Sequence, residues 1–193
     1  MDAAFLYNRY LLKRQTLALT GKFRIYAPDG RLVLYSQQKM FRLREDIRVF
    51  ADESMTRELL HIQARQIIDF AAAYDVFDTQ TGQKVGTLRR KGFRSLVRDA
   101  WEILDAQDQP LGVIREDSMT LALLRRFLLG SLLPQNYDVL INQQRVADLK
   151  QRFRLIGYHL DIDFTMDTAG LLDHRLGIAA AILLAAIEGK QAS

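Results

Sequence analysis

Hydrophobic and polar residues alternate along much of this chain with a period of two, the spacing that places successive side chains on opposite faces of a β-strand. One unit recurs: an alternating run, a short polar turn and a second alternating run. Aromatic and β-branched residues fill many of the apolar positions, as is typical of strands buried on one face. The pattern predicts four β-hairpins, at residues 23–36, 74–90, 101–116 and 137–151.

The turns of these hairpins contain residues that tight chain reversals need. Gly30 and Gly82 can adopt a positive φ without steric cost. Asp78 and Asp105 stand where a side-chain oxygen can accept hydrogen bonds from the turn backbone. The turn chemistry therefore agrees with the alternation on either side of it.

Further strands are expected outside these hairpins. Residues 47–51 and 58–64 can pair across the polar stretch between them. The second and third hairpins each carry a glycine in the returning strand, Gly86 and Gly112, which indicates a bend or a close backbone approach. Together these features predict an antiparallel sheet that curves into a barrel.

The most regular alternation covers residues 158–167, where we expect one strand with an apolar face toward the core and an acidic face toward solvent. The apolar face comprises Tyr158, Leu160, Ile162, Phe164 and Met166, and the polar face comprises His159, Asp161, Asp163, Thr165 and Asp167.

The segment 173–188 predicts a helix that is apolar on every side, because no polar side chain lies between Leu176 and Ile187. Asp173 is a suitable N-cap and Gly189 a suitable stop. The apolar run would span about 18 Å, whereas a bilayer core requires about 20 such residues. We therefore expect a helix in the protein core and no transmembrane span. Its core residues are Leu176, Ile178, Ile182, Leu183, Leu184 and Ile187.

Residues 117–133 predict a second, amphipathic helix, in which Arg125 and Arg126 accompany a row of leucines. One interpretation is an interfacial helix that dips into a bilayer. The other is a helix that covers one end of the barrel. The leucines at helical spacing are Leu121, Leu124, Leu128 and Leu132.

Composition places the chain among ordinary globular proteins, with 193 residues, 49% hydrophobic and 26% charged. No linker divides it, so we expect one domain over residues 1–193. The absence of cysteine excludes disulfides and thiolate chemistry, and the N-terminus does not resemble a secretory signal, so we expect a cytoplasmic protein. The net charge of +4 favours anionic partners.

Motifs for catalysis do not occur in the sequence. His61, His159 and His174 lack the spacing of zinc enzymes, no serine lies in a nucleophile elbow, and no glycine-rich nucleotide loop is present. We therefore expect a protein that is not an enzyme and has no cofactor. Phe93 is the single aromatic residue interleaved with the basic run 89–98, so nucleic-acid binding is disfavoured.

Repeated D-x-x-G hairpins, a leucine-rich helix before a Tyr-containing strand, and an acidic strand leading into an alanine-rich terminal helix resemble the LURP-one-related proteins. That family is similar to phospholipid scramblases and to the Tubby C-terminal domain. The resemblance spans essentially the whole chain. It implies a closed barrel of about twelve antiparallel strands around a central hydrophobic C-terminal helix. It also implies either lipid association or no assigned activity.

Two groups of residues follow from this resemblance. Scramblases bind calcium in an acidic segment before the terminal helix, where this chain has Asp161, Asp163 and Asp167; alternating aspartates are also expected on any exposed strand face. Tubby-like domains bind phosphoinositide headgroups through clustered cations. The nearest equivalent is a basic cluster of five residues that an ordinary solvated turn would also explain: Arg89, Arg90, Lys91, Arg94 and Arg98.

The charge pattern and the resemblance together favour a non-enzymatic barrel that associates peripherally with anionic phospholipid, or that has the scramblase-like lipid role which the resemblance implies. The first alternative is a scaffold or protein-binding module that uses an exposed sheet edge or the basic face and has no lipid activity. The second is a lipocalin-like carrier of apolar ligands, which requires an empty barrel interior.

Overall fold

The computed structural model describes residues 1–15, 20–39, 46–65, 72–90, 100–117, 135–152 and 157–187. Strands dominate this part of the chain. They are β1 (Arg9–Gln15), β2 (Thr20–Tyr26), β3 (Leu32–Lys39), β4 (Asp46–Phe50), β5 (Glu58–Ala64), β6 (Ala73–Asp78), β7 (Lys84–Arg90), β8 (Ala100–Leu104), β9 (Pro110–Glu116), β10 (Asn136–Ile141), β11 (Gln144–Arg152) and β12 (Tyr158–Asp163). One 3₁₀ turn, η1 (Ala3–Phe5), and one α-helix, α2 (His174–Ile187), complete the described elements.

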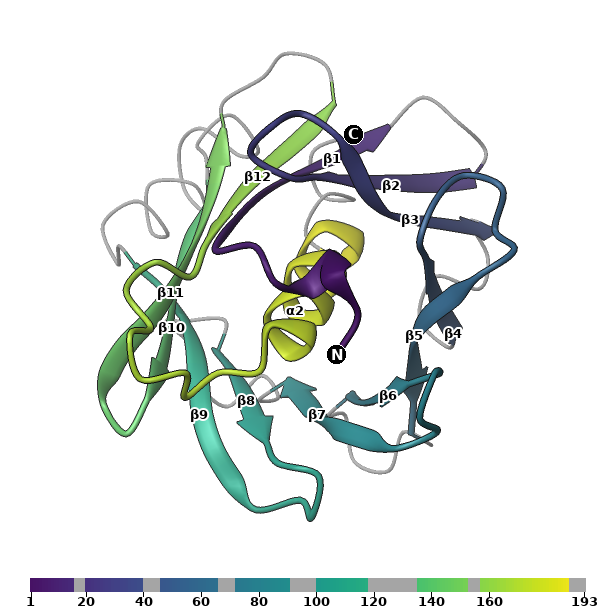
Figure 1. The fold of residues 1–193 in the computed structure, drawn as a ribbon. Coiled ribbons are helices and arrows are strands. Elements are labelled where there is room, and N and C mark those ends of the chain that lie inside the picture. Colours follow the sequence, from purple (N-terminus) through teal and green to yellow (C-terminus); the bar gives the residue numbers. More distant parts are fainter. Residues whose placement is uncertain are drawn as a thin grey trace.

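The strands form a closed antiparallel barrel in which each strand pairs with its neighbours in sequence. The ring closes between β1 and β12, where Leu12 lies opposite Leu160. Figure 1 looks into this ring and shows α2 at its centre. The predicted twelve-stranded barrel is therefore confirmed. Because the ring of described strands is closed, protein docking through an exposed sheet edge has no support.

The hairpins form where turn residues permit a left-handed backbone. Gly30 has φ +82° between β2 and β3, and Gly82 has φ +69° between β6 and β7. The β10–β11 turn instead uses Asn142 and Gln143, with φ +50° and +66°. Two consecutive left-handed residues match the right-handed twist of the flanking strands. All four predicted hairpins are present, and β4 and β5 pair across residues 51–57 as expected.

The central helix fills the barrel, and its described side chains from Leu176 to Ala186 are buried. Asp173 caps it by accepting a hydrogen bond from the Arg175 N–H at 2.9 Å. A Cβ on Gly177 would lie 2.4 Å from Cε1 of Phe164, so glycine is required for this close approach. The prediction of a buried core helix is confirmed, although the side chain of Ile187 lies outside the description. A filled interior is inconsistent with a lipocalin-like carrier.

Arginines hold the helix at both of its ends. Near the first turn, Arg175 donates to Asp78 at 2.5 Å and to Asp173, so two carboxylates offset a cation that would otherwise oppose the helix dipole. Near the last turn, the buried Arg14 donates to the carbonyl of Ala185 at 2.8 Å. Burial lowers the pKa of Arg14, but its cation lies at the favourable end of the dipole.

The N-terminal segment crosses one mouth of the barrel, in front of α2 in Figure 1. Phe5 is only 1% exposed. The hydroxyl of Tyr10 donates to the carbonyl of Ala4 at 3.0 Å, and Nδ1 of His174 lies 2.9 Å from the carbonyl oxygen of Phe5. Sequence reasoning did not anticipate this closure, because a short irregular segment has no periodic pattern.

Strand β12 is shorter than predicted, and the expected strand over residues 158–167 is wrong beyond Asp163. The chain turns there because Asp163 accepts from the Thr165 N–H at 2.8 Å, and Asp167 accepts from the N–H groups of Leu171 and Leu172 at 2.9 and 2.8 Å. Phe164 nevertheless faces the core. The predicted helix over 117–133 and the stop at Gly189 lie outside the described residues.

Candidate functional site

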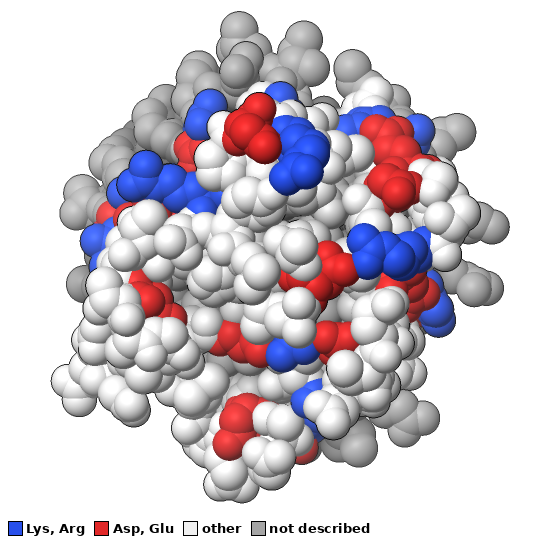
Figure 2. Space-filling model, viewed as in Figure 1, with Lys and Arg blue, Asp and Glu red and all other residues white. Residues whose placement is uncertain are grey.

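The two ends of the barrel differ in the segments that connect the strands. At one end the connections are residues 27–31, 51–57, 79–83, 105–109, 142–143 and 164–173. We call it the acidic end, because these segments contain seven acidic and two basic residues. Figure 2 views this end and shows red and blue side chains in contact. The acidic residues are Asp29, Asp52, Glu53, Asp105, Asp108, Asp167 and Asp173, and the basic ones are Arg31 and Arg57.

The opposite end, the basic end, is where the strands terminate at Gln15, Lys39, Ala64, Arg90, Glu116 and Arg152. In the sequence, the six segments that follow these strand ends contain nine basic and four acidic residues, and nearly half of their residues are Leu, Ile, Val, Met or Phe. The basic residues are Arg42, Arg44, Arg65, Lys91, Arg94, Arg98, Arg125, Arg126 and Arg154, and the acidic ones are Glu45, Asp69, Asp99 and Asp117. The strand order places the six strand ends together, and the charge of the segments that follow them is a property of the sequence.

The predicted basic cluster begins on β7 at this end. Arg89 points outward and its Nε donates to Glu102 of β8 at 2.7 Å. Arg90 lies opposite Trp101 in the register between β7 and β8. The other three members, Lys91, Arg94 and Arg98, lie outside the described residues. The outward charge of Arg89 is thus offset by a carboxylate, so any net cationic character of the cluster must come from its other four members.

The three calcium candidates each have other partners in the structure. Asp161 accepts two hydrogen bonds from Arg152, at 2.6 and 2.7 Å. Asp163 accepts a hydrogen bond from Arg9 at 3.0 Å. Burial acts to raise the pKa of Asp163, but the hydrogen bonds from Thr165 and the charge of Arg9 outweigh it and lower the pKa. Asp167 caps the turn before α2. Within the described ranges, no group of three or more His, Cys, Asp or Glu side chains could hold a metal ion.

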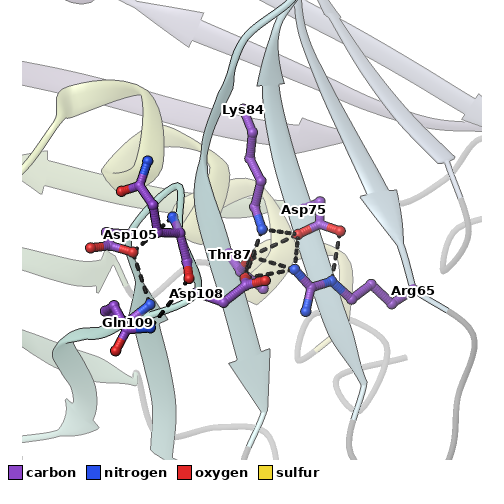
Figure 3. A network of polar contacts seen from close by, with 8 residues as sticks. Arg65, Asp75, Lys84, Thr87, Asp105, Asp108 and Gln109 are labelled. Carbon is purple, nitrogen blue, oxygen red and sulfur yellow. Dashed lines mark hydrogen bonds and ion pairs between the residues drawn. The ribbon is translucent and has the colours of Figure 1, made fainter.

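A polar network on the outer face of β6 and β7 was not foreseen from the sequence (Figure 3). Lys84 donates to Asp75 at 3.0 Å and to Asp108 at 2.7 Å, while Arg65 donates to the same carboxylates at 2.7 and 2.6 Å. The hydroxyl of Thr87 lies 2.7 Å from Asp75 and 3.0 Å from Asp108. These contacts connect Arg65, which follows β5, with side chains of β6 and β7 and with Asp108 in the turn between β8 and β9.

The network acts as a clasp rather than as a reactive centre. Hydrogen bonds from Lys84 and Arg65 hold the pKa of Asp108 well below its usual range, so its carboxylate is a poor base. Asp108 has φ +64°, a conformation that favours glycine, and its side chain attaches the β8–β9 turn to β7. Asp105, one of the predicted turn aspartates, accepts the N–H groups of Gln107 and Gln109 at 2.9 and 2.8 Å in the same turn.

A groove of about 550 Å³ runs along the outer face of β8, β9 and β10. Its apolar part contains the half-buried side chains of Leu111, Val113 and Leu140. Arg115 lies at the end of the groove toward the basic end of the barrel. The remaining lining residues are Glu102, Pro110, Gly112, Asn142 and Gln143.

None of the described helices is long and apolar enough to cross a membrane.

The fold and the central helix define a class of closed antiparallel barrels threaded by their own C-terminal helix. A sequence model of the LURP-one-related family matches residues 32–185, from the start of β3 to near the end of α2. Because this match covers well over half of the sequence, the chain belongs to the LURP-one-related family. No curated protein matches the sequence.

Proposed function

We propose that this LURP-one-related protein is a non-enzymatic barrel that binds the surface of anionic membranes through its basic end. The observation that carries the proposal is the contrast between the two ends, whose connecting segments have opposite charge and very different apolar content. A cation-rich surface interspersed with large apolar side chains is the composition that binds anionic lipid interfaces.

The energetic argument rests on many weak contributions. Each Lys or Arg near an anionic leaflet contributes about 1 kcal/mol, and the attraction decays over a Debye length of about 10 Å at 0.1 M salt. The excess of cations at the basic end therefore suffices for reversible binding at low salt. Insertion of apolar side chains would add a contribution that salt does not screen.

The acidic end supplies no comparable surface. Several of its acidic side chains are engaged within the protein, as in the ion pairs of Glu53 with Arg24 at 2.6 Å and of Asp108 with Lys84 at 2.7 Å. An anionic leaflet would repel the remaining carboxylates at this end. The proposal therefore gives the protein a fixed orientation, with the N-terminal segment facing away from the membrane.

Vesicle flotation tests this proposal. The full chain is mixed with vesicles of phosphatidylcholine alone or with phosphatidylserine, at low and high salt. We expect flotation only with the anionic vesicles, and a strong reduction at high salt.

Two charge-reversal variants with the same change in net charge separate orientation from overall charge. Arg94→Glu with Arg98→Glu alters the basic end, whereas Arg31→Glu with Arg57→Glu alters the acidic end. We expect flotation to be lost in the first variant and retained in the second, with thermal unfolding confirming that both are folded. Equal loss in both variants, or no flotation of the unaltered protein at low salt, contradicts the proposal.

A further inference from the structure

The outer groove over β8–β10 offers a ligand an apolar wall and a single cationic end. Pro110 and Leu111 lie at the end of β9 nearest the acidic end of the barrel, and Arg115 lies at the other. Five residue steps along a strand cover about 17 Å. The groove is therefore elongated, and its chemistry changes from apolar to charged along its length.

Arg115 is the charge available to a ligand. It is exposed, and it makes no hydrogen bond or ion pair with any residue in the described ranges. The neighbouring carboxylates are engaged elsewhere: Glu102 by Arg89 at 2.5 Å, and Asp138, the cross-strand neighbour of Arg115, by Arg145 at 2.7 Å. These four partners form two ion pairs, neither of which involves Arg115.

The apolar wall is formed by side chains that are only partly covered. Val113 lies between Glu102 and Leu140 in the strand register, and Leu111 lies at a register shift in β9, where it also packs against the core. All three apolar side chains are half-buried and line the groove. Apolar side chains in such a position can still lose water when a ligand covers them.

From this arrangement we infer that the groove binds an unbranched long-chain carboxylate, with its alkyl chain along Leu111, Val113 and Leu140 and its carboxylate on Arg115. A planar guanidinium can bind a carboxylate through two parallel hydrogen bonds, which fixes the direction of the ligand. This site does not depend on membrane binding, since it lies on the side of the barrel.

Titration of the full chain with dodecanoate, below the concentration at which it forms micelles, tests the inference. We expect saturable binding of one ligand, with shifts of the methyl resonances of Leu111, Val113 and Leu140. Arg115→Gln should weaken binding about tenfold by removing the charged contact. Val113→Trp should abolish binding by filling the groove. Arg31→Gln makes the same chemical change at the acidic end and should leave the affinity unaltered.

Three outcomes would overturn the inference. In the first, the unaltered protein shows no saturable binding. In the second, the Arg115→Gln and Val113→Trp variants bind dodecanoate as tightly as the unaltered protein does. In the third, the unaltered protein binds dodecanol, which lacks the carboxylate, as tightly as dodecanoate. Vesicle flotation of the two groove variants keeps this test separate from the proposed function. If the groove variants lose dodecanoate binding but still float with anionic vesicles, the groove binds the carboxylate independently of the membrane. If neither the unaltered protein nor the variants float, the proposed membrane binding fails and the dodecanoate result still stands.

Discussion

The acidic and basic ends of the barrel are built from connections of the same topological kind but with opposite chemistry. At the acidic end, the short turns form hydrogen bonds within themselves, and the N-terminal segment covers the central helix. At the basic end, the connecting segments are rich in leucine and arginine. A large apolar content is costly on a surface that only meets water. The difference suggests that the acidic end maintains the fold and the basic end meets a partner.

The central helix links the two ends, since Arg175 fixes its start to Asp78 and Arg14 binds the carbonyl of Ala185 near its last turn. Both ends therefore depend on one buried element. A change that affects only one end must leave this helix in place.

Deletion of residues 173–193 should have the largest effect, because the barrel would close around an empty interior. We expect loss of cooperative folding, measured by circular dichroism and thermal unfolding. A truncated chain that remained soluble and unfolded cooperatively would show that the helix is not the core of the barrel.

Substitution of Phe5 should reveal how much the closure of the acidic end contributes. Phe5→Ala should lower the free energy of unfolding by about 3–5 kcal/mol, as is typical when a buried aromatic ring is removed. Leu6→Ala is the control, since Leu6 is 64% exposed and should change stability by less than about 0.5 kcal/mol. Chemical denaturation measures both. Similar losses in the two variants would contradict the described closure.

The pairing of Asp78 with Arg175 should make the acidic end sensitive to acid. Burial acts to raise the pKa of Asp78, but the contacts with Arg175 and the turn backbone outweigh it, so the folded pKa lies below the model-peptide value of 3.8. This contribution to stability is complete above that value and is lost as the pH falls through the folded pKa.

The variant Asp78→Asn should therefore lower the free energy of unfolding at neutral pH by about 2 kcal/mol, with a smaller loss at acidic pH. Denaturation at a series of pH values between about 2 and 7 would measure this difference. A constant difference between the variant and the unaltered protein would show that the carboxylate charge is not involved.

At the basic end, Leu128→Asp distinguishes the two interpretations of residues 117–133. An interfacial helix predicts weaker flotation with anionic vesicles and a nearly unchanged unfolding transition. A helix that covers the barrel predicts a loss of stability instead. Leu124 precedes Leu128 by one turn of the predicted helix, so each interpretation predicts the same result for Leu124→Asp as for Leu128→Asp.

The smallest effect is expected for Arg89→Gln. Its ion pair with Glu102 is partly exposed, and such pairs contribute about 0–1 kcal/mol. Because Glu102 already offsets its charge, flotation should also change less than with Arg94→Gln, the same substitution beyond β7. A larger loss of flotation for Arg89→Gln would place the lipid contact on the strand itself.

Much of the fold could be predicted from local patterns. Alternation and turn residues such as Gly30 predicted the hairpins, because both depend on residues close in sequence. The unbroken apolar run from Leu176 to Ile187 predicted a buried helix. The same reasoning extended the last strand to residue 167. The alternation continues that far, but the capping contacts of Asp163 and Asp167 end the strand earlier.

The candidate site was less predictable, because it depends on residues that meet only after folding. The basic cluster was visible as a run of charges, but the pairing of Arg89 with Glu102 required the register of two strands. The clasp around Asp108 and the groove beside Arg115 each combine residues from several strands, and no local pattern marks them.

The sequence by itself thus determined most of the strands, although not β1, together with most of their turns and the buried helix, since these follow from short-range periodicity and backbone preference. Only the tertiary structure decided which loops share an end, which carboxylates offset which cations, and that Phe5 closes the barrel over the helix. These depend on strand register and barrel closure, which bring residues distant in sequence within contact distance.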